Sequence, residues 1–319
     1  MHVLIIGAGG FIGSRLAMEY RQKNPNASIS LFDLHIPEAL KENPGFTCIT
    51  GNFGDPAQTD PLLEKKPDLI FHLAAVVSGE AEKNFDLGMQ VNLRGSLHLL
   101  EKCRELGHQP RIVFASSCGI FGGDVHQVIT ENTAPKPRSS YGTQKAIVDL
   151  LMNDYSRRGF VDARCLRLPT ITVRPGKPNA ATSSFLSGII REPLNGQQAS
   201  YPVDPASEFW ILSPKQVVKN LIHAAALEAE VIGEDRTINL PGLTVSVQHM
   251  IDCLGKVAGP EITQFLIHKP DAFLQSIVLT WPPHFNTQKA DQLGFTADRD
   301  VEEIIRNYVR EENIQLQNS

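Results

Sequence analysis

A glycine-rich turn near the amino terminus constrains the fold of this chain more than any other feature. The apolar run at residues 3–6 reads as a buried strand, and it leads directly into Gly7-Ala8-Gly9-Gly10-Phe11-Ile12-Gly13, where a helical pattern opens. Glycine permits a tight turn at position 7, close approach of a diphosphate at position 10, and close helix packing at position 13. The turn predicts a nucleotide-binding strand-helix unit, although such a turn alone can be purely structural.

The first half of the chain alternates short apolar runs with helical patterns, which is typical of a parallel sheet covered on both faces. Two apolar stripes at helical spacing, one through Leu93, Leu97, Leu100 and Cys103 and one through Ile147, Leu150 and Leu151, can each lie on a sheet. We therefore expect an α/β fold with a doubly wound, Rossmann-type parallel sheet. The predicted strands are Val3–Ile6, Ser28–Phe32, Phe46–Thr50, Leu69–Leu73, Arg111–Ala115 and Ala163–Leu168.

After Pro169 the pattern changes to a proline-punctuated loop and then to further helices. We expect a small, discontinuous α+β substrate domain made of residues 171–208 and 243–319. The dinucleotide-binding domain would comprise residues 1–170 and resume at about 209–242. The helices are indicated by apolar positions at Phe185, Leu186, Ile189 and Ile190, at Val217, Val218, Leu221, Ile222 and Ala225, at Val247, Met250, Ile251 and Leu254, and at Val301, Ile304, Ile305, Tyr308 and Val309.

Composition excludes several classes of protein. Thirty basic and thirty-five acidic residues give a net charge of -5, which offers no overall attraction to nucleic acid or to an anionic membrane. No apolar run is long enough to cross a bilayer. The 5 cysteines are scattered, without the spacing of a disulfide framework or a zinc site. We expect a cytoplasmic protein that binds no metal.

An acidic residue follows the second predicted strand at the distance that a dinucleotide site requires. Asp33 lies twenty residues after Gly13, where a carboxylate can accept hydrogen bonds from the adenosine ribose. The alternative interpretation is a solvated acid at a strand end. Leu34 and His35 follow, so no neighbouring arginine is available for a ribose 2'-phosphate. The sequence favours NAD over NADP.

A tyrosine and a lysine four residues apart, Tyr141 and Lys145, lie on one face of a predicted helix. Tyrosine has an ordinary pKa of about 10, but a neighbouring ammonium group stabilises the phenolate, and such a pair can take a proton from an alcohol. Ser116 and Ser117 end the fifth strand at the sheet edge where ligands bind in such folds. An ordinary amphipathic helix and a strand-end turn are the alternatives.

These motifs together resemble the extended short-chain dehydrogenase/reductase superfamily across nearly the whole chain. The likeness covers Gly7, Gly10, Gly13, Asp33, the run 71–75, Asn92, the serine strand and residues 141–145. It implies a catalytic set of Ser117, Tyr141, Lys145 and Asn92, in which Lys145 also holds the nicotinamide ribose. The cofactor contacts it implies are Gly7, Gly10, Phe11, Ile12, Gly13, Asp33, Asn52, Phe53, Leu73, Ala74, Ala75, Asn92, Tyr141, Lys145 and Leu168.

Departures from the family pattern point away from a nucleotide sugar. Asn52 stands where the family often has an aspartate near the adenine, and it can still hydrogen-bond there. Thr170 replaces an expected asparagine after the sixth strand, and Glu208 replaces a phosphate-binding arginine, so it would repel a diphosphate. A later arginine is also absent from the run Leu279-Thr280-Trp281-Pro282-Pro283.

The predicted substrate is instead a small sugar acid. Residues 74–82, 166–181 and 187–194 resemble the D-erythronate dehydrogenase branch of the superfamily. Basic and amide side chains near the domain junction suit one carboxylate and several hydroxyls, although they could equally cap helices or lie in solvent. The predicted substrate contacts are Ser78, Ser117, Cys118, Tyr141, Thr170, Arg174, Lys177, Asn179 and Arg191.

The expected reaction is NAD-dependent oxidation of a 2-hydroxyl to a 2-oxo acid. Tyr141 would take the hydroxyl proton, assisted by Ser117 and Lys145, while Arg174 or Lys177 anchors the carboxylate. A nucleotide-sugar epimerase or dehydratase with the same triad is the alternative, and a non-catalytic NAD sensor is a third class. The resemblance also implies a homodimer packed through the helices that begin near Leu87 and Tyr141.

Overall fold

The computed structural model describes residues 1–123, 126–177 and 181–316. The chain divides into two compact units. The first unit comprises Met1–Ile120, Ser140–Arg167 and Val218–Ile238; the second comprises Phe121–Ser139, Leu168–Val217 and Asn239–Ser319. None of the helices in these described ranges is long and apolar enough to span a membrane.

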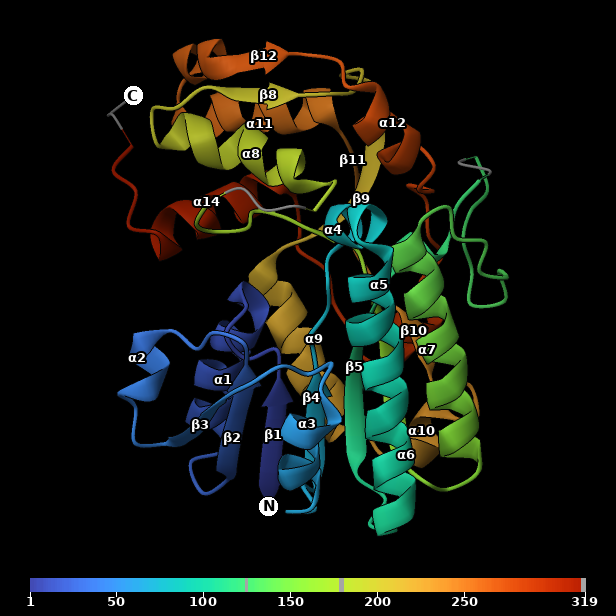
Figure 1. Cartoon of the computed structure of the whole chain (residues 1–319). Helices are drawn as coiled ribbons and strands as arrows, with labels where there is room; N and C mark the ends of the chain where they lie inside the picture. Colours follow the sequence, from blue (N-terminus) through green and yellow to red (C-terminus); the bar gives the residue numbers. More distant parts are fainter. Residues whose placement is uncertain (124–125, 178–180, 317–319) are drawn as a thin grey trace. The chain divides into compact units, whose positions relative to one another are not determined.

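A seven-stranded sheet organises the first unit (Figure 1). Its strand order is β10-β6-β5-β4-β1-β2-β3, and β1 pairs in parallel with both β2 and β4. This is the doubly wound Rossmann order, in which the chain reverses direction across the sheet between β1 and β4. The predicted α/β fold is confirmed. The strands are β1 His2–Ile6, β2 Ser28–Asp33, β3 Phe46–Thr50, β4 Leu69–His72, β5 Arg111–Ser117, β6 Asp162–Leu168 and β10 Thr237–Asn239.

Helices cover the sheet, and the long helices α6 and α7 lie side by side (Figure 1). Their buried positions, among them Leu99, Leu100, Val148 and Met152, share one apolar core with Phe114 of β5. The helical elements are α1 Phe11–Lys23, α2 Glu38–Lys41, α3 Pro56–Leu63, α4 Ser78–Lys83, α5 Phe85–Gly88, the π-helical η1 Met89–Gly95, α6 Ser96–Leu106, η2 Cys118–Ile120, α7 Ser140–Arg157, α9 Pro214–Ala226 and α10 Ala229–Ile232.

The face of α7 that packs on the sheet differs from the predicted one. Ile147 and Leu150 are 37% and 67% exposed, so the expectation that they lie on the sheet is wrong, whereas Leu151 of the same stripe packs against the core. The helix is apolar on two faces, and it buries Val148 and Met152 instead. Leu97 of α6 is 38% exposed as well. Helical spacing alone could not show which of the two apolar faces packs.

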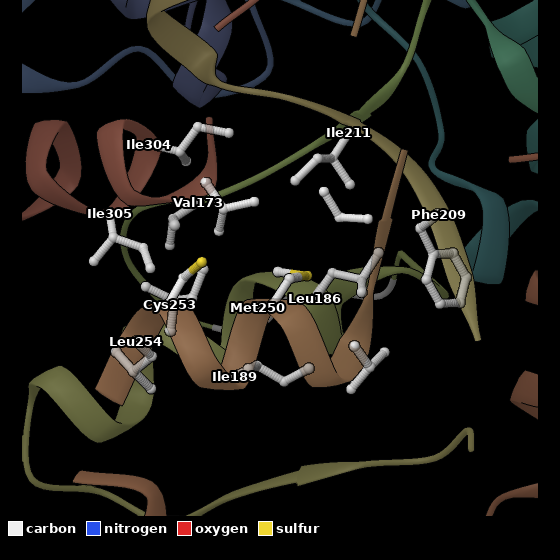
Figure 2. Close-up of a cluster of buried hydrophobic side chains, with 14 of the residues drawn as sticks. Val173, Leu186, Ile189, Phe209, Ile211, Met250, Cys253, Leu254, Ile304 and Ile305 are labelled. Carbon is white, nitrogen blue, oxygen red and sulfur yellow. The ribbon is translucent and has the colours of Figure 1, made fainter. Parts of the chain in front are cut away.

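The second unit is built around its own apolar core (Figure 2). Leu186 and Ile189 of α8, Met250 of α11, Ile304 of α14 and Phe209 of β9 all contribute to it, which confirms the helical stripes predicted there. A three-stranded sheet (β11-β9-β7) and a two-stranded one (β12-β8) belong to this unit. Its elements are β7 Thr170–Ile171, α8 Ser184–Leu194, β8 Ala199–Tyr201, β9 Glu208–Leu212, β11 Leu243–Ser246, α11 Val247–Ala258, η3 Pro260–Phe265, β12 Leu266–His268, α12 Ala272–Val278, α13 Gln288–Gln292 and α14 Val301–Glu311.

The segment Phe121–Ser139 groups with the second unit, whereas the sequence pattern placed it with the first. Backbone hydrogen bonds explain the grouping. The Ile129 N–H donates to His284 O (2.9 Å), and the Asn286 N–H donates to Ile129 O (2.8 Å). Such pairing between segments far apart in sequence leaves no local signal in the residues.

Candidate active site

The glycine turn joins β1 to α1 at the point where the sheet order reverses. Gly7 has φ +88°, and a Cβ there would lie 2.5 Å from Ala74 N, so only glycine fits. At Gly10, the N-cap of α1, a Cβ would meet nothing closer than Gly7 O at 3.5 Å. The protein itself therefore does not require glycine at position 10, and the open space fits the close approach of a diphosphate.

The start of α1 suits an anion. In the part of the chain that the structure describes, no side chain caps this helix end, and its first turn has no acidic residue. The positive end of the helix dipole is thus not neutralised by a carboxylate. The residues present fit the diphosphate of a dinucleotide.

Asp33 ends β2 beside this turn, where it is half-buried. Its carboxylate accepts from the N–H of Gly9 (2.9 Å) and, less closely, of His35 (3.3 Å). Gly9 was not among the predicted site residues, yet a Cβ there would lie 1.7 Å from His35 O. The sequence signal that could have identified Gly9 is its position within the glycine-rich run 7–13. The hydrogen bond from Gly9 fixes one Asp33 oxygen, so the carboxylate is held in place for ribose hydroxyls.

The residues predicted for the adenine side have different surroundings. Asn52 accepts the Gly54 N–H through its side-chain oxygen (2.9 Å), which leaves its amide nitrogen as the donor for a base. Phe53 is buried, and its ring lies 4.7 Å from that of His72, so it packs in the core. Leu73 and Ala74 follow β4 and donate their N–H groups to Ile6 O (2.8 and 3.1 Å), which places them beside the end of β1.

Lys145 and Asn92 are the two buried members of the predicted catalytic set, each at 2% exposure. The Lys145 ammonium donates to Ala115 O (2.8 Å) and lies 4.4 Å from the centre of the Phe114 ring. The ammonium is 5.8 Å from the centre of the Tyr141 ring, and Tyr141 itself is half-buried at the start of α7. Burial lowers the pKa of Lys145 to about 8, against a smaller opposing effect of Asp149.

The structure distinguishes the two serines of β5. Ser116 is only 2% exposed, whereas Ser117 is half-buried and its hydroxyl accepts the Gly119 N–H (3.0 Å). The Ser117 hydroxyl keeps its proton for another acceptor. Cys118 is buried, and burial raises the pKa of its thiol to about 12, so the thiol stays neutral.

Asn92, on the π-helical segment η1, uses its whole amide in local hydrogen bonds. Its oxygen accepts from Val76 N (2.7 Å), and its nitrogen donates to Val76 O (3.0 Å) and Gln144 Oε1 (2.8 Å). Asn92 therefore links the loop after β4 to α7. Sequence reasoning missed Gln144, which lies next to Lys145 on that helix.

The residues predicted for the substrate fall on both units. Ser78 is the buried first residue of α4 in the first unit. In the second unit, Arg191 is buried and donates to Glu192 Oε1 (2.6 Å) and Arg174 O (2.8 Å). Arg191 and Lys177 both line a pocket of about 330 Å³. Thr170 is buried in β7, Leu168 ends β6, and Asn179 lies outside the described residues.

Glu208, predicted to replace a phosphate-binding arginine, is an exposed residue at the start of β9. Its carboxylate lies 3.3 Å from His284 Nε2. A carboxylate at this position does not attract a diphosphate, whether or not a histidine lies beside it.

The strand order of the first unit, with a glycine turn and Asp33 at the point where the order reverses, is that of the dinucleotide-binding Rossmann class. The chain belongs to the NAD dependent epimerase/dehydratase family, whose model matches residues 3–225. The superfamily resemblance predicted from the motifs is confirmed.

Two curated relatives resemble the chain over nearly their full length. The D-erythronate dehydrogenase of Cupriavidus necator is 48% identical, with 98% of each chain covered. The D-erythronate dehydrogenase of Haemophilus influenzae is 42% identical, with 97% of this chain and 99% of the relative covered. The predicted likeness to this branch is confirmed.

Among solved structures, the chain is similar to the nucleoside-diphosphate-sugar epimerase from Agrobacterium tumefaciens. The TM-score is 0.93 and the sequence identity 40%, over 99% of this chain and 96% of the other. This likeness supports the fold.

Proposed function

We propose that this protein is an NAD-dependent dehydrogenase that oxidises the 2-hydroxyl of a small sugar acid similar to D-erythronate, giving a 2-oxo acid. The observation that carries the proposal is the 48% and 42% identity, over nearly the full length, to two D-erythronate dehydrogenases. The surroundings of Ser117, Tyr141 and Lys145 support the chemistry.

The proposed proton transfer uses groups of the first unit. Tyr141 takes the proton of the 2-hydroxyl, and the Lys145 ammonium favours the phenolate that accepts it. Ser117 donates a hydrogen bond to the substrate oxygen, because its own lone pair already accepts from Gly119. NAD, when bound, supplies the acceptor for the hydride from C2. Asn92 acts as a positioning residue through Val76 and Gln144.

We propose NAD rather than NADP as the cofactor. The Asp33 carboxylate, oriented by Gly9, can accept from ribose hydroxyls and would repel a 2'-phosphate. Leu34 beside it is 68% exposed and offers no positive charge. The glycine turn and the first turn of α1 would hold the diphosphate.

Arg174 and Lys177 are the stronger candidates for the substrate carboxylate. Arg191 already donates to the Glu192 carboxylate, and separating that buried pair would leave a charge unpaired. Lys177 lines the same pocket as Arg191, Glu192 and Glu312, but it forms no ion pair with any described residue. We expect Lys177→Met to raise KM for the sugar acid more than it lowers kcat.

An epimerase acting on nucleotide sugars is the second candidate, favoured by the likeness to the Agrobacterium protein. The two are separated by following NADH absorbance with added NAD across four-carbon sugar acids, and by testing UDP-sugars for epimerisation. A dehydrogenase accumulates NADH with a sugar acid. Conversion of UDP-sugars alone would overturn the proposal, and NAD binding without any turnover would indicate a sensor.

We further propose that the protein is a cytoplasmic homodimer. Apolar side chains on α5, α6 and α7 of the first unit are exposed, and a second copy of the chain would cover them. All five cysteines are free, which supports a reducing compartment. Sedimentation of the wild-type chain and of Leu150→Glu tests the dimer: the variant should sediment as a monomer. The exposed residues are Phe85, Leu87, Leu97, Ile147 and Leu150.

A further inference from the structure

Two further ionisable side chains are buried behind Lys145. Asp149 of α7 is 1% exposed and Arg167 of β6 is 6% exposed, compared with 2% for Lys145. Burying a charge is costly unless it is paired, and an apolar pair of similar volume would fill the same space. Packing alone therefore does not explain why this pair lies next to the catalytic lysine.

The geometry links the pair to Lys145. Arg167 Nε donates to Asp149 Oδ2 (3.0 Å). Asp149 follows Lys145 by four residues on α7, so the two side chains lie on one face of the helix. On the other side, the Lys145 ammonium donates to Ala115 O, which fixes it towards β5.

The pair also borders the serine strand. Ser116 Oγ and Asp149 Oδ1 are both buried, and neither makes a hydrogen bond of standard geometry within the described chain. The hydroxyl nevertheless lies close enough to favour the ionised Asp149 carboxyl. Burial raises the pKa of Asp149, and the Arg167 guanidinium is the first of the groups that oppose this rise.

Other titratable groups face Lys145 from neighbouring elements. His72 of β4 is fully buried, and burial holds its pKa well below the usual range, so it is neutral near pH 7. Cys165 of β6 and Tyr141 of α7 are the others. Asp149 is the one carboxylate, among the described residues, that acts on the Lys145 pKa.

We propose that the Asp149–Arg167 ion pair is a positioning device for the catalytic lysine: Asp149 keeps Lys145 as an ammonium ion in its buried site, and Arg167 keeps Asp149 ionised. The pair thereby sets the upper pH limit of turnover. This effect on turnover, unlike the effect on the charge of Lys145, rests on the proposed function. Lys145 must be charged to favour the Tyr141 phenolate, so activity falls as pH rises through the Lys145 pKa, about 8 in the intact protein.

The test compares the wild-type chain with three variants, D149E, D149N and D149N/R167M. In D149N the negative charge is lost and the positive charge of Arg167 acts on Lys145 unopposed, so the Lys145 pKa should fall by about one to three units. The double variant D149N/R167M loses both charges, so its Lys145 pKa should lie between those of the wild type and D149N. D149E keeps the charge and should stay near the wild type.

Two measurements report these shifts. One is the alkaline limb of kcat/KM against pH with the sugar acid. The other is a nuclear magnetic resonance titration of lysine labelled with ¹³C at Cε, in which Lys145→Met identifies the Lys145 signal. The titration needs no turnover, so it tests the inference even if the proposed substrate is wrong.

Asp154→Asn is the matched control. Asp154 lies on the same helix but is exposed and paired with Arg157, so its loss should leave the Lys145 pKa unchanged. A folded D149N or D149N/R167M protein with an unshifted Lys145 pKa would overturn the inference, because a purely structural pair loses stability without moving that pKa. If D149N does not fold, the Lys145 pKa is compared between the wild type, D149N/R167M and D149E.

Discussion

Replacing Asn92 by alanine removes three hydrogen bonds from a buried site. The lost bonds are those to Val76 N, Val76 O and Gln144 Oε1, at 2.7, 3.0 and 2.8 Å. Each hydrogen bond contributes about 0.5–1.5 kcal/mol net, and unsatisfied buried partners add to the cost. We expect the free energy of unfolding to fall by about 2–4 kcal/mol. Turnover should fall too, because the loop at Val76 and the helix that carries Lys145 lose their link.

Urea unfolding of the wild type, Asn92→Ala and Asn92→Asp measures the stability loss. The aspartate keeps the acceptor for Val76 N but loses both donors, and it also takes a negative charge into a buried site. Asn24→Ala is the control, since Asn24 makes one side-chain hydrogen bond, to Tyr20 O, at a partly buried helix end. The control should lose less than about 1 kcal/mol. If Asn92→Ala lost no more than the control, the three bonds would not hold the loop as argued.

Three further predictions concern the proposed chemistry and its pH dependence. Tyr141→Phe should abolish NADH formation while NADH binding, followed by fluorescence, changes little, because only the proton acceptor is lost. Asp33→Ala should weaken NAD binding by about tenfold to a hundredfold, the worth of a charge-assisted hydrogen bond, and NADP binding should weaken less; calorimetry measures both. His72 has a lowered pKa in the folded chain, so its contribution to stability is present above the unfolded pKa of about 6.5 and is lost as pH falls below that value. Urea unfolding between pH 7 and pH 5 should show this loss in the wild type and a smaller one in His72→Gln.

The strands of the main sheet could be predicted from the sequence because each is a short apolar run next to a turn signal. All six predicted strands agree with the structure to within two residues at each end. The seventh, β10, was missed because three residues, Thr237–Asn239, are too few to show a pattern. Its place beside β6 depends on tertiary contacts.

Candidate site residues could be predicted from the sequence wherever a turn or a strand end requires a fixed residue at a fixed spacing. Gly7 and Asp33 are of this kind, since the turn and the strand end are local features. The partners of Asn92 and the pairing of Asp149 with Arg167 join elements distant in sequence. These hydrogen bonds and this ion pair cannot be predicted from residue spacing, because they depend on the fold.

The charges of the second unit bear on the choice between a sugar acid and a nucleotide sugar. A diphosphate needs cations whose charge is not already balanced by carboxylates. Arg191 is paired with Glu192, and Glu208 adds a negative charge beside His284. A single carboxylate can be held by one cation, and Lys177 forms no ion pair among the described residues. Neither Arg191 nor the position of Glu208 therefore offers an unbalanced positive charge to a diphosphate, whereas Lys177 can hold the one carboxylate of a sugar acid, which supports the dehydrogenase proposal.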